Sequence, residues 1–287
     1  MFNIFEFVIF HVALGSNETV HPNQTLKHKE YLSMIQMVFA SALLFYPEAK
    51  TTILTDIHSD FEGIPRRVNR VRINIDTNKL MFERANAQLR YVQENSFASP
   101  IVFLDSDILI NDSLLPIFKN EFDVAVTWRA NEIMPINGGF LILNNTRPEI
   151  TKRFFKRYIT IYQEKYADKA AWFGDQLALR DCVGLNVLKL AGQEIVDIEG
   201  CRILLLPCDT YNFSPKNRYQ EICSNLSDKA VLHFKGERKR LMLPFWEAWL
   251  KPSNSYMPWV KYKGWLERRR LRRYSEIEEL KFNSPRD

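Results

Sequence analysis

The segment Ile101-Val102-Phe103-Leu104-Asp105-Ser106-Asp107 joins four apolar residues to two carboxylates that one residue separates. A short, continuous apolar run is typical of a strand buried on both faces of a parallel sheet. In an open α/β sheet, ligands bind beyond the carboxyl ends of the strands. We therefore predict an α/β fold with a ligand site at Asp105 and Asp107.

The two aspartates are suited to a metal ion. Extended backbone directs Asp105 and Asp107 to the same side of the chain and Ser106 to the other. Hard carboxylate oxygens suit Mn²⁺ or Mg²⁺, and the remaining metal positions suit phosphate oxygens and water. The competing interpretation is a solvated turn, because Asp-x-Asp is frequent by chance, but the preceding buried strand favours the metal.

The rest of the chain alternates between strand-like and helix-like segments. Strands are predicted at residues 7–10, 51–55, 68–75, 101–104, 122–128, 140–143, 202–206 and 230–234, and helices at 26–45, 79–94, 151–166 and 172–179. This alternation predicts a doubly wound, mostly parallel but mixed sheet flanked by helices. We assign residues 1–240 to one catalytic domain and residues 241–287 to a basic helical tail.

The apolar start of the chain, residues 2–14, has two interpretations. It has the apolar character of a signal sequence, but it lacks a basic first part and contains Glu6 and His11. We favour the first strand of the sheet.

A second motif lies more than a hundred residues after the aspartates. His233 ends an apolar run, Gly236 follows three residues later, and Lys239 three residues after that. A neutral imidazole can complete a metal shell. Glycine allows the backbone to approach a phosphate, and the lysine ammonium can neutralise it. Taken alone, this motif is also compatible with a surface histidine before a basic turn.

Together, the two motifs resemble the nucleotide-sugar-dependent glycosyltransferases of the GT-A fold, most of all the family-8 type. The resemblance spans roughly residues 5 to 240, and two further segments contribute to it. Asn137-Gly138-Gly139-Phe140 resembles the family's N-x-G turn before an apolar strand, and Gly174-Asp175-Gln176 resembles its D-Q pair at a helix start.

The resemblance implies a role for each matching residue. Asp105, Asp107 and His233 would hold Mn²⁺ or Mg²⁺. Gly236 and Lys239 would contact the diphosphate, and the sugar pocket would be lined by Asn137, Gly138, Asp175 and Gln176. Val12 and Ala13 would form the nucleotide-base site. The family also has an arginine near the donor, for which Arg90 fits the spacing best and Arg84 is the rival.

The activity implied is transfer of a hexose from a nucleotide-diphosphate sugar, UDP-linked by resemblance, to a glycan, lipid-linked or protein acceptor. Family 8 implies retention at the anomeric carbon, with Gln176 or Asp175 facing it. An inverting enzyme would need a base on the acceptor side, which Asp175 could supply. Two alternatives stay open: a sugar-1-phosphate nucleotidyltransferase, although no glycine-rich phosphate loop follows the first strand, and a non-catalytic sugar-binding protein.

The charge of the chain is local. The 287 residues contain 39 Lys and Arg against 34 Asp and Glu, a net charge of +5. Residues 261–274 hold seven basic residues and one acidic residue, and without them 32 basic residues face 33 acidic ones. We therefore predict no nucleic-acid partner. Basic residues interleaved with Trp and Tyr suit an anionic membrane surface, which residues 260–274 would contact, although a solvated or docked basic helix explains them equally well.

The cysteines and sequons bear on the compartment. Cys182, Cys201, Cys208 and Cys223 fit no common zinc spacing, so we expect buried free thiols. Six N-x-S/T sequons begin at Asn17, Asn23, Asn111, Asn144, Asn212 and Asn225, and we interpret them as unglycosylated. We expect a cytoplasmic protein, with peripheral attachment to a membrane; the alternative is the lumen of the secretory pathway.

Overall fold

The centre of the molecule is a mixed β-sheet built around two apolar strands. The computed structural model describes residues 5–13, 28–131, 133–170, 173–184, 194–215, 225–251, 265–266 and 268–270. Strand β1 (Glu6–Phe10) pairs in parallel with β2 (Lys50–Asp56) on one side and with β4 (Ile101–Leu104) on the other. All four residues of β4 are buried, as the apolar run predicts.

The full sheet has eight strands. The remaining strands are β3 (Asn69–Ile73), β6 (Val124–Trp128), β7 (Ile136–Leu143), β8 (Glu194–Ile198) and β9 (Cys201–Pro207), and the order is β3-β2-β1-β4-β7-β6-β9-β8. Strands β3, β2, β1 and β4 run in parallel, as do β6 and β9. Strand β7 is antiparallel to both neighbours, and β8 is antiparallel to β9. The predicted mostly parallel, mixed sheet is confirmed; β8 was not predicted.

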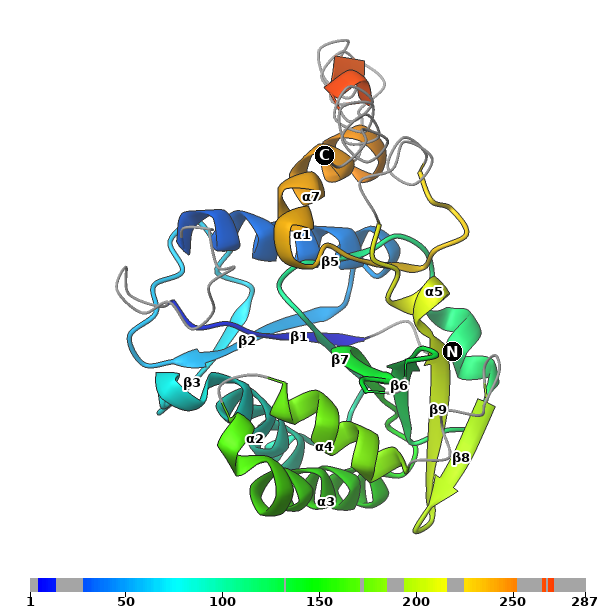
Figure 1. Ribbon diagram of the computed structural model, residues 1–287. Helices are drawn as coiled ribbons and strands as arrows, with labels where there is room; N and C mark the ends of the chain where they lie inside the picture. Colours follow the sequence, from blue (N-terminus) through cyan, green and yellow to red (C-terminus); the bar gives the residue numbers. More distant parts are fainter. Residues whose placement is uncertain are drawn as a thin grey trace, which may run out of the picture.

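Helices cover both faces of the sheet (Figure 1). Helix α1 (His28–Phe45) and helix α7 (Lys239–Phe245) pack on one face, where they share a core with alternate side chains of β1 and β4. Helices α2 (Leu80–Glu94), α3 (Pro148–Tyr166) and α4 (Gly174–Val183) share a second core with the other face. Because strand side chains alternate between faces, β4 contributes Val102 and Leu104 to the first core and Ile101 and Phe103 to the second.

A second, two-stranded sheet brings the two sequence motifs together. Strand β5 (Ile108–Ile110) follows Asp107 directly and pairs antiparallel with β10 (Val231–His233), with His233 opposite Ile108. The backbone N–H of Phe234 donates to the Asp107 carbonyl at 2.8 Å. Strand β5 was not predicted, because a three-residue apolar run is too short to distinguish from a loop.

The segment Asn137-Gly138-Gly139 lies inside β7 and does not form a turn before it, so the expected turn is corrected. The pairing of β6 with β7 shifts there: Val126 pairs with Leu141, whereas Thr127 pairs with Asn137. The extra β7 residues form a bulge, and bulges re-aim side chains beside functional sites.

The segment assigned to the tail begins within the core. Leu241, Met242 and Phe245 of α7 are buried, and the π-helix at Trp246–Leu250 (η6) continues the same packing. Further along, the Arg268 guanidinium lies 5.3 Å from the centre of the Trp249 ring and donates to the Ala248 carbonyl at 3.0 Å. None of the helices described is long and apolar enough to cross a bilayer.

Three of the four cysteines and the asparagines of four of the six sequons lie within the described residues, and of these four asparagines Asn225 is exposed. Cys182, Cys201 and Cys208 are free thiols, and the first two are buried. Asn144 and Asn212 are buried, and the Asn111 amide nitrogen donates to three backbone carbonyls, those of Asn225, Leu226 and Lys229. A glycan cannot attach to these three amides in the folded chain. Cys223, Asn17 and Asn23 lie outside the described residues.

Burial of His11, just after β1, predicts that the stability of the fold falls in acid. Its ring stacks on His28, and burial, followed by repulsion from His28, lowers the pKa of His11 from its usual 6.5 to about 3. Between these values the unfolded chain binds a proton that the folded chain does not, so stability falls as the pH drops below 6.5. From pH 7 to pH 5 we expect His11 to account for about 2 kcal/mol of lost unfolding free energy.

Urea unfolding of the wild type and His11→Gln at pH 5, 6 and 7 measures this effect. The variant should lose distinctly less stability over this range than the wild type. His58→Gln, which changes an exposed imidazole, is the matched control. Equal pH dependence in His11→Gln and the wild type would contradict the account.

Candidate metal and donor-sugar site

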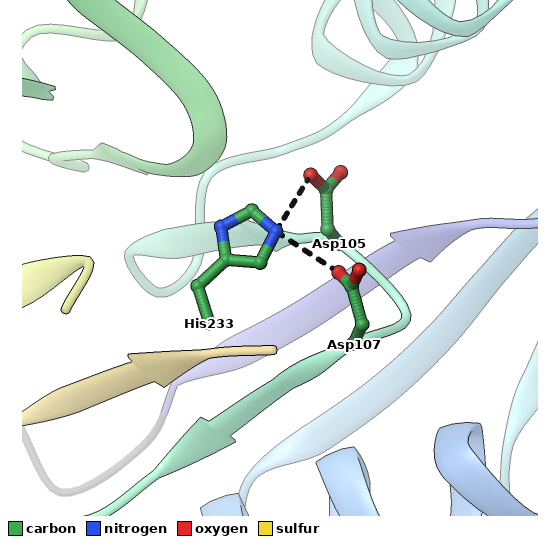
Figure 2. Close-up of side chains that lie close together, drawn as sticks. All are labelled: Asp105, Asp107 and His233. Carbon is green, nitrogen blue, oxygen red and sulfur yellow. Dashed lines mark ion pairs between the residues drawn. The ribbon is translucent and has the colours of Figure 1, made fainter. Parts of the chain in front are cut away.

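Three potential metal ligands converge where β4 ends and where β10 meets β5 (Figure 2). His233 Nε2 lies 3.0 Å from Asp107 Oδ1 and 3.6 Å from Asp105 Oδ2. One ligand atom from each residue lies within 4.8 Å of the other two. Mn²⁺ accepts a donor set of two carboxylates and one imidazole. The structure thus brings the three predicted ligands together as a group that could hold a metal ion.

The charge states of these groups favour a cation. Burial raises the pKa of Asp107, but the facing His233 and Lys239 outweigh it, so its pKa lies well below the ordinary value. Burial lowers the pKa of His233, and the nearby Asp107 opposes this only in part. At neutral pH the carboxyl is therefore ionised and the imidazole neutral, and metal ligands must be in these states to bind.

Arg84 of α2, and not Arg90, lies at the site. The Arg84 guanidinium pairs with Asp105 at 2.8 Å and with Asp175 at 3.4 Å, and it donates to the Gly138 carbonyl at 2.6 Å. Arg90 pairs instead with Glu94 on the exposed face of the helix. The assignment of Arg90 is therefore replaced by its rival, Arg84.

Burial and ion pairing act on Arg84 in opposite directions. Burial lowers the pKa of Arg84, but Asp105 and Asp175 raise it by more, so the pKa lies above its ordinary value and the guanidinium is cationic. Arg84 thus links Asp105, a candidate metal ligand, to Asp175 at the start of α4.

The residues predicted to line a sugar pocket come from β7 and α4. The Asn137 amide nitrogen donates to Gln176 Oε1 at 3.3 Å, and Asp175 lies beside Gly138. Asp175 is only 4% exposed, and its Oδ1 has no hydrogen-bond partner among the described residues. Burial, opposed by Arg84, raises the pKa of Asp175. A buried carboxylate oxygen without a donor fits a ligand hydroxyl group.

The start of α4 depends on two unusual residues. Phe173 adopts a left-handed conformation, with φ of 66°, immediately before the helix. Any side chain at Gly174 would collide with the Tyr162 ring. These constraints hold Asp175 and Gln176 in the first turn of the helix, next to the bulge in β7.

Gly139 leaves room for two of the candidate metal ligands. A Cβ atom at this position would lie 2.5 Å from His233 Cε1 and 2.6 Å from Asp105 Oδ2. The Gly139 carbonyl also accepts from the Asp105 N–H at 2.9 Å. The bulge therefore provides a cradle that only glycine permits, with two of the three ligands against it.

The residues predicted for the diphosphate lie on the other side of Asp107. Lys239 Nζ is 2.9 Å from Asp107 Oδ2, and although burial lowers the pKa of Lys239, Asp107 raises it above the ordinary value. Gly236 has a φ of +56°, a conformation that favours glycine, and apart from its chain neighbours no described residue comes within 4 Å of a Cβ placed there. Among the described residues, the backbone at Gly236 thus borders open space, three positions before the half-buried ammonium group of Lys239.

Val12 and Ala13 follow β1 at the same edge of the sheet. Val12 is buried, and the Ala13 N–H donates to Ser59 Oγ at 2.6 Å. Ser59 is held in turn by Asp56 at the end of β2, through a 2.9 Å hydrogen bond to its N–H. No base-recognising side chain is apparent at these two residues.

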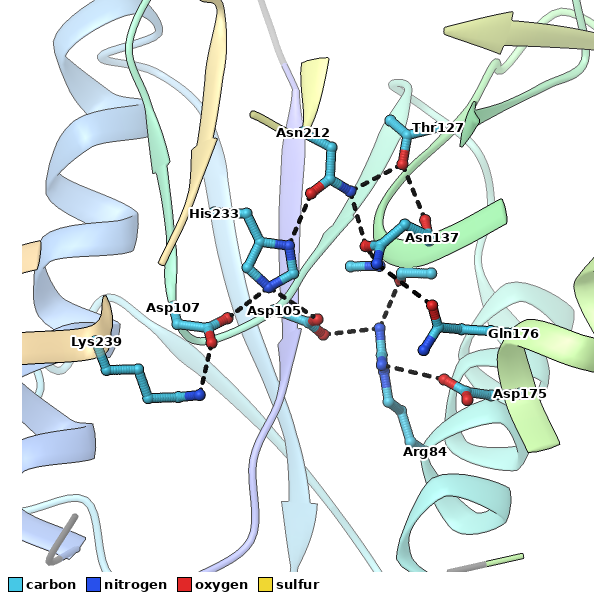
Figure 3. Close-up of polar contacts among 12 residues, drawn as sticks. Arg84, Asp105, Asp107, Thr127, Asn137, Asp175, Gln176, Asn212, His233 and Lys239 are labelled. Atoms are coloured by element: carbon cyan, nitrogen blue, oxygen red, sulfur yellow. Dashed lines mark hydrogen bonds and ion pairs between the residues drawn. The ribbon is translucent and has the colours of Figure 1, made fainter. Parts of the chain in front are cut away.

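Two buried polar residues of the site, Thr127 and Asn212, were not predicted as part of it. Asn212 follows helix α5 (Cys208–Tyr211) and contacts His233, Thr127 and Asn137 (Figure 3). The sequence presents Asn212 only as a sequon, and no local pattern marks either residue, because their partners lie far away along the chain.

Comparison with known proteins identifies the fold. No protein-family model and no curated protein sequence matches the chain. Among solved structures, the galactosyltransferase LgtC, in complex with donor and acceptor sugar analogs, matches with a TM-score of 0.50 and 13% identity over 90% of this chain and 99% of its own. The chain therefore has the GT-A glycosyltransferase fold, as the sequence motifs predicted.

Two further solved structures are similar at lower scores. A glycosyltransferase involved in glycosylation of the major capsid of PBCV-1 has a TM-score of 0.47 and 12% identity over 84% of this chain and 98% of its own. The glycosyltransferase GlyE of Streptococcus pneumoniae TIGR4 has a TM-score of 0.49 and 13% identity over 93% of this chain and 64% of its own.

The variant Gly139→Ala tests the cradle. The added methyl group must displace His233 or Asp105, so we expect the unfolding free energy to fall by about 1–3 kcal/mol and Mn²⁺ affinity to fall about tenfold or more. Urea unfolding and calorimetric Mn²⁺ titration measure the two effects.

Gly138→Ala is the matched control for the same measurements. Its Cβ would meet only ordinary contacts, the nearest being Leu179 Cδ1 at 3.5 Å. Mn²⁺ affinity in Gly138→Ala should stay within about twofold of the wild type. A Gly139→Ala variant that binds Mn²⁺ as tightly as the wild type would show that the cradle has no part in metal binding.

Proposed function

We propose that this protein is a metal-dependent glycosyltransferase that transfers a hexose from a nucleotide-diphosphate sugar, most simply a UDP-sugar, to a hydroxyl group of a glycan or lipid-linked acceptor. The observation that carries the proposal is the convergence of Asp105, Asp107 and His233 at the carboxyl edge of a GT-A sheet. LgtC, which shares the fold, was crystallised with donor and acceptor sugar analogs, and this supports the same kind of substrate here.

The charges of the site match a diphosphate leaving group. A divalent cation held by Asp105, Asp107 and His233, with Mn²⁺ the first candidate, would supply Lewis-acid neutralisation of the diphosphate. Lys239 adds a fixed positive charge beside Asp107, where negative charge develops as the bond to the sugar breaks. Gly236 allows the backbone to approach a phosphate oxygen.

The sugar would lie between the bulge in β7 and the start of α4. Asp175 Oδ1 can accept a hydrogen bond from a sugar hydroxyl, and Arg84 fixes the position of the same carboxylate through Oδ2. Gln176 and Asn137 form a hydrogen-bonded pair whose amides can orient the ring. These residues bind and orient the donor while the anomeric carbon becomes cation-like.

Retention of the anomeric configuration is the stereochemistry we propose. A base for inversion must reach the acceptor hydroxyl from the side opposite the leaving group. Asp175 is buried and paired with Arg84, which disfavours this role. With retention, Gln176 and Asp175 face the reacting carbon, and the departing phosphate oxygen takes the proton of the acceptor.

Incubation with Mn²⁺ and a panel of nucleotide sugars tests the proposal, with free sugar and nucleotide measured by chromatography. We expect slow, metal-dependent hydrolysis of one UDP-sugar, with UDP-glucose and UDP-galactose tried first. Asp107→Asn, which keeps the side-chain volume but removes the charge that binds the metal, should lower the rate by more than about 100-fold.

Asp168→Asn changes a carboxylate that is 71% exposed and pairs with Lys169, so it serves as the control and should leave the rate unchanged. Absence of any response to nucleotide sugars would contradict the proposal. Turnover of a nucleoside triphosphate with a sugar-1-phosphate would instead identify a nucleotidyltransferase.

We further propose that residues 260–274 attach the protein to anionic membranes from the cytoplasmic side. Of this segment, Trp265 and Leu266 are helical and exposed, and the Arg269 guanidinium lies 4.7 Å from the centre of the Trp265 ring. Exposed Trp and Leu beside arginines are the side chains that bind at an anionic interface.

Co-sedimentation with vesicles tests the attachment in the full chain. Neutralising Arg269, Arg270, Arg272 and Arg273 to Gln should lower partitioning onto anionic vesicles at least about tenfold, since each basic residue contributes about 1 kcal/mol near such a surface. The matched control replaces four exposed basic residues elsewhere, namely Arg66, Arg67, Lys119 and Lys156. Equal loss in both variants, or equal binding to neutral vesicles, would contradict the proposal.

A further inference from the structure

Asn212 lies behind the metal ligand His233 and is almost completely buried, at 2% exposure. Its Oδ1 is 2.8 Å from His233 Nδ1. Its Nδ2 is 2.8 Å from both Thr127 Oγ1 and Asn137 Oδ1. Every polar atom of the side chain therefore has a partner in the site, although the sequence gives it no recognised role.

The direction of these hydrogen bonds follows from a single backbone group. The Gly139 N–H can only donate, and it lies 3.1 Å from the Asn137 side chain, so the atom that faces it must be the oxygen Oδ1. The Asn212 atom that faces the same oxygen must then be the NH₂ group.

Thr127 leads to the same orientation independently. Its hydroxyl donates its single proton to the Asn137 carbonyl at 2.9 Å, so Thr127 Oγ1 can only accept from Asn212. With the NH₂ group committed to two acceptors, the remaining Asn212 atom is the oxygen, and it faces His233. An amide oxygen can only accept, so the proton of this contact lies on His233 Nδ1.

From this geometry we infer that Asn212 is a positioning residue, which holds a proton on Nδ1 of His233 so that the lone pair of Nε2 faces the metal. The inference rests on the proposed metal site. It assigns the ring the tautomer that an Nε2-bound metal requires, and metal-binding histidines generally donate their other N–H to such a partner.

Without a cation, Asp107 Oδ1, 3.0 Å from His233 Nε2, favours a proton on that atom. A proton on Nε2 in place of the one on Nδ1 is nevertheless unfavourable in this pocket. A proton on Nε2 alone would place the lone pair of Nδ1 against the Asn212 oxygen. Rotating the amide to relieve this contact would turn its oxygen toward two atoms that can only accept, Thr127 Oγ1 and Asn137 Oδ1. Because the whole group is buried, water cannot replace the lost hydrogen bonds.

Mn²⁺ affinity of variants of the full chain, measured calorimetrically without nucleotide, tests the inference. Asn212→Ala should weaken Mn²⁺ binding about 10–100-fold. Asn212→Asp, which keeps an acceptor for the Nδ1 proton, should recover most of this loss, although it also loses the two bonds donated by the NH₂ group. Thr127→Val, which keeps the shape of the buried side chain, should weaken binding by a smaller factor.

A matched variant separates positioning from stability. Asn144 is also buried, at 6% exposure, and its amide donates to the Phe122 carbonyl away from the site. Asn144→Ala should leave Mn²⁺ affinity unchanged. If Asn212→Ala does not fold, the Mn²⁺ affinities of Thr127→Val and Asn212→Asp still test the inference.

A proton NMR signal provides a readout that a purely structural role would not change. The wild type should show a slowly exchanging imidazole N–H signal on Nδ1 of His233, with and without Mg²⁺, that His233→Gln removes. Asn212→Ala should lose this signal. Retention of the signal together with wild-type Mn²⁺ affinity in Asn212→Ala would overturn the inference, whereas failure of the wild type to bind Mn²⁺ would overturn the proposed function instead.

Discussion

The site is organised by the need to keep three carboxylates close together at a sheet edge that is largely shielded from water. Asp105, Asp107 and Asp175 would repel one another strongly without compensation. Arg84 joins the first to the third, and Lys239 pairs with the second. Among these five side chains, three formal negative charges against two positive ones leave a net charge of −1. A divalent cation would reverse this sign, and the site would then attract a diphosphate.

The surrounding strands and helices position these charged side chains. Asp105 and Asp107 are placed by the end of β4 in the centre of the sheet, and His233 and Lys239 approach them because β10 pairs with β5. Arg84 and Asp175 come from α2 and α4 on one face of the sheet, whereas Lys239 begins α7 on the other. The bulge in β7 lies between these groups, and its glycines allow a close approach that a side chain would block.

Much of this could be predicted from the sequence because the decisive signals are local. The buried run before Asp105 and the spacing from His233 to Lys239 depend on neighbours within a few residues, and the structure brings both segments together. Arg90 was preferred to Arg84 because spacing along the chain does not specify the face of a helix. Six residues turn a helix by about 240°, so the two arginines point in very different directions.

Other parts of the site depend on contacts between distant segments and leave no local pattern. Strand β5 is recognisable only from its pairing with β10. Asn212 meets Thr127, which lies 85 positions away along the chain. A hydrogen-bonded network of this kind is specified by the tertiary structure, and its members look like ordinary polar residues in the sequence.

The central claim is that one divalent cation binds Asp105, Asp107 and His233 together and positions a nucleotide sugar. A crystal structure with Mn²⁺ and a UDP-sugar, with data collected at the manganese absorption edge, tests it most directly. The account predicts one anomalous peak about 2.1 Å from an oxygen of each aspartate and bonded to His233 Nε2, with diphosphate oxygens on its open side. A peak that lies elsewhere, or a nucleotide sugar bound away from this edge of the sheet, would contradict it.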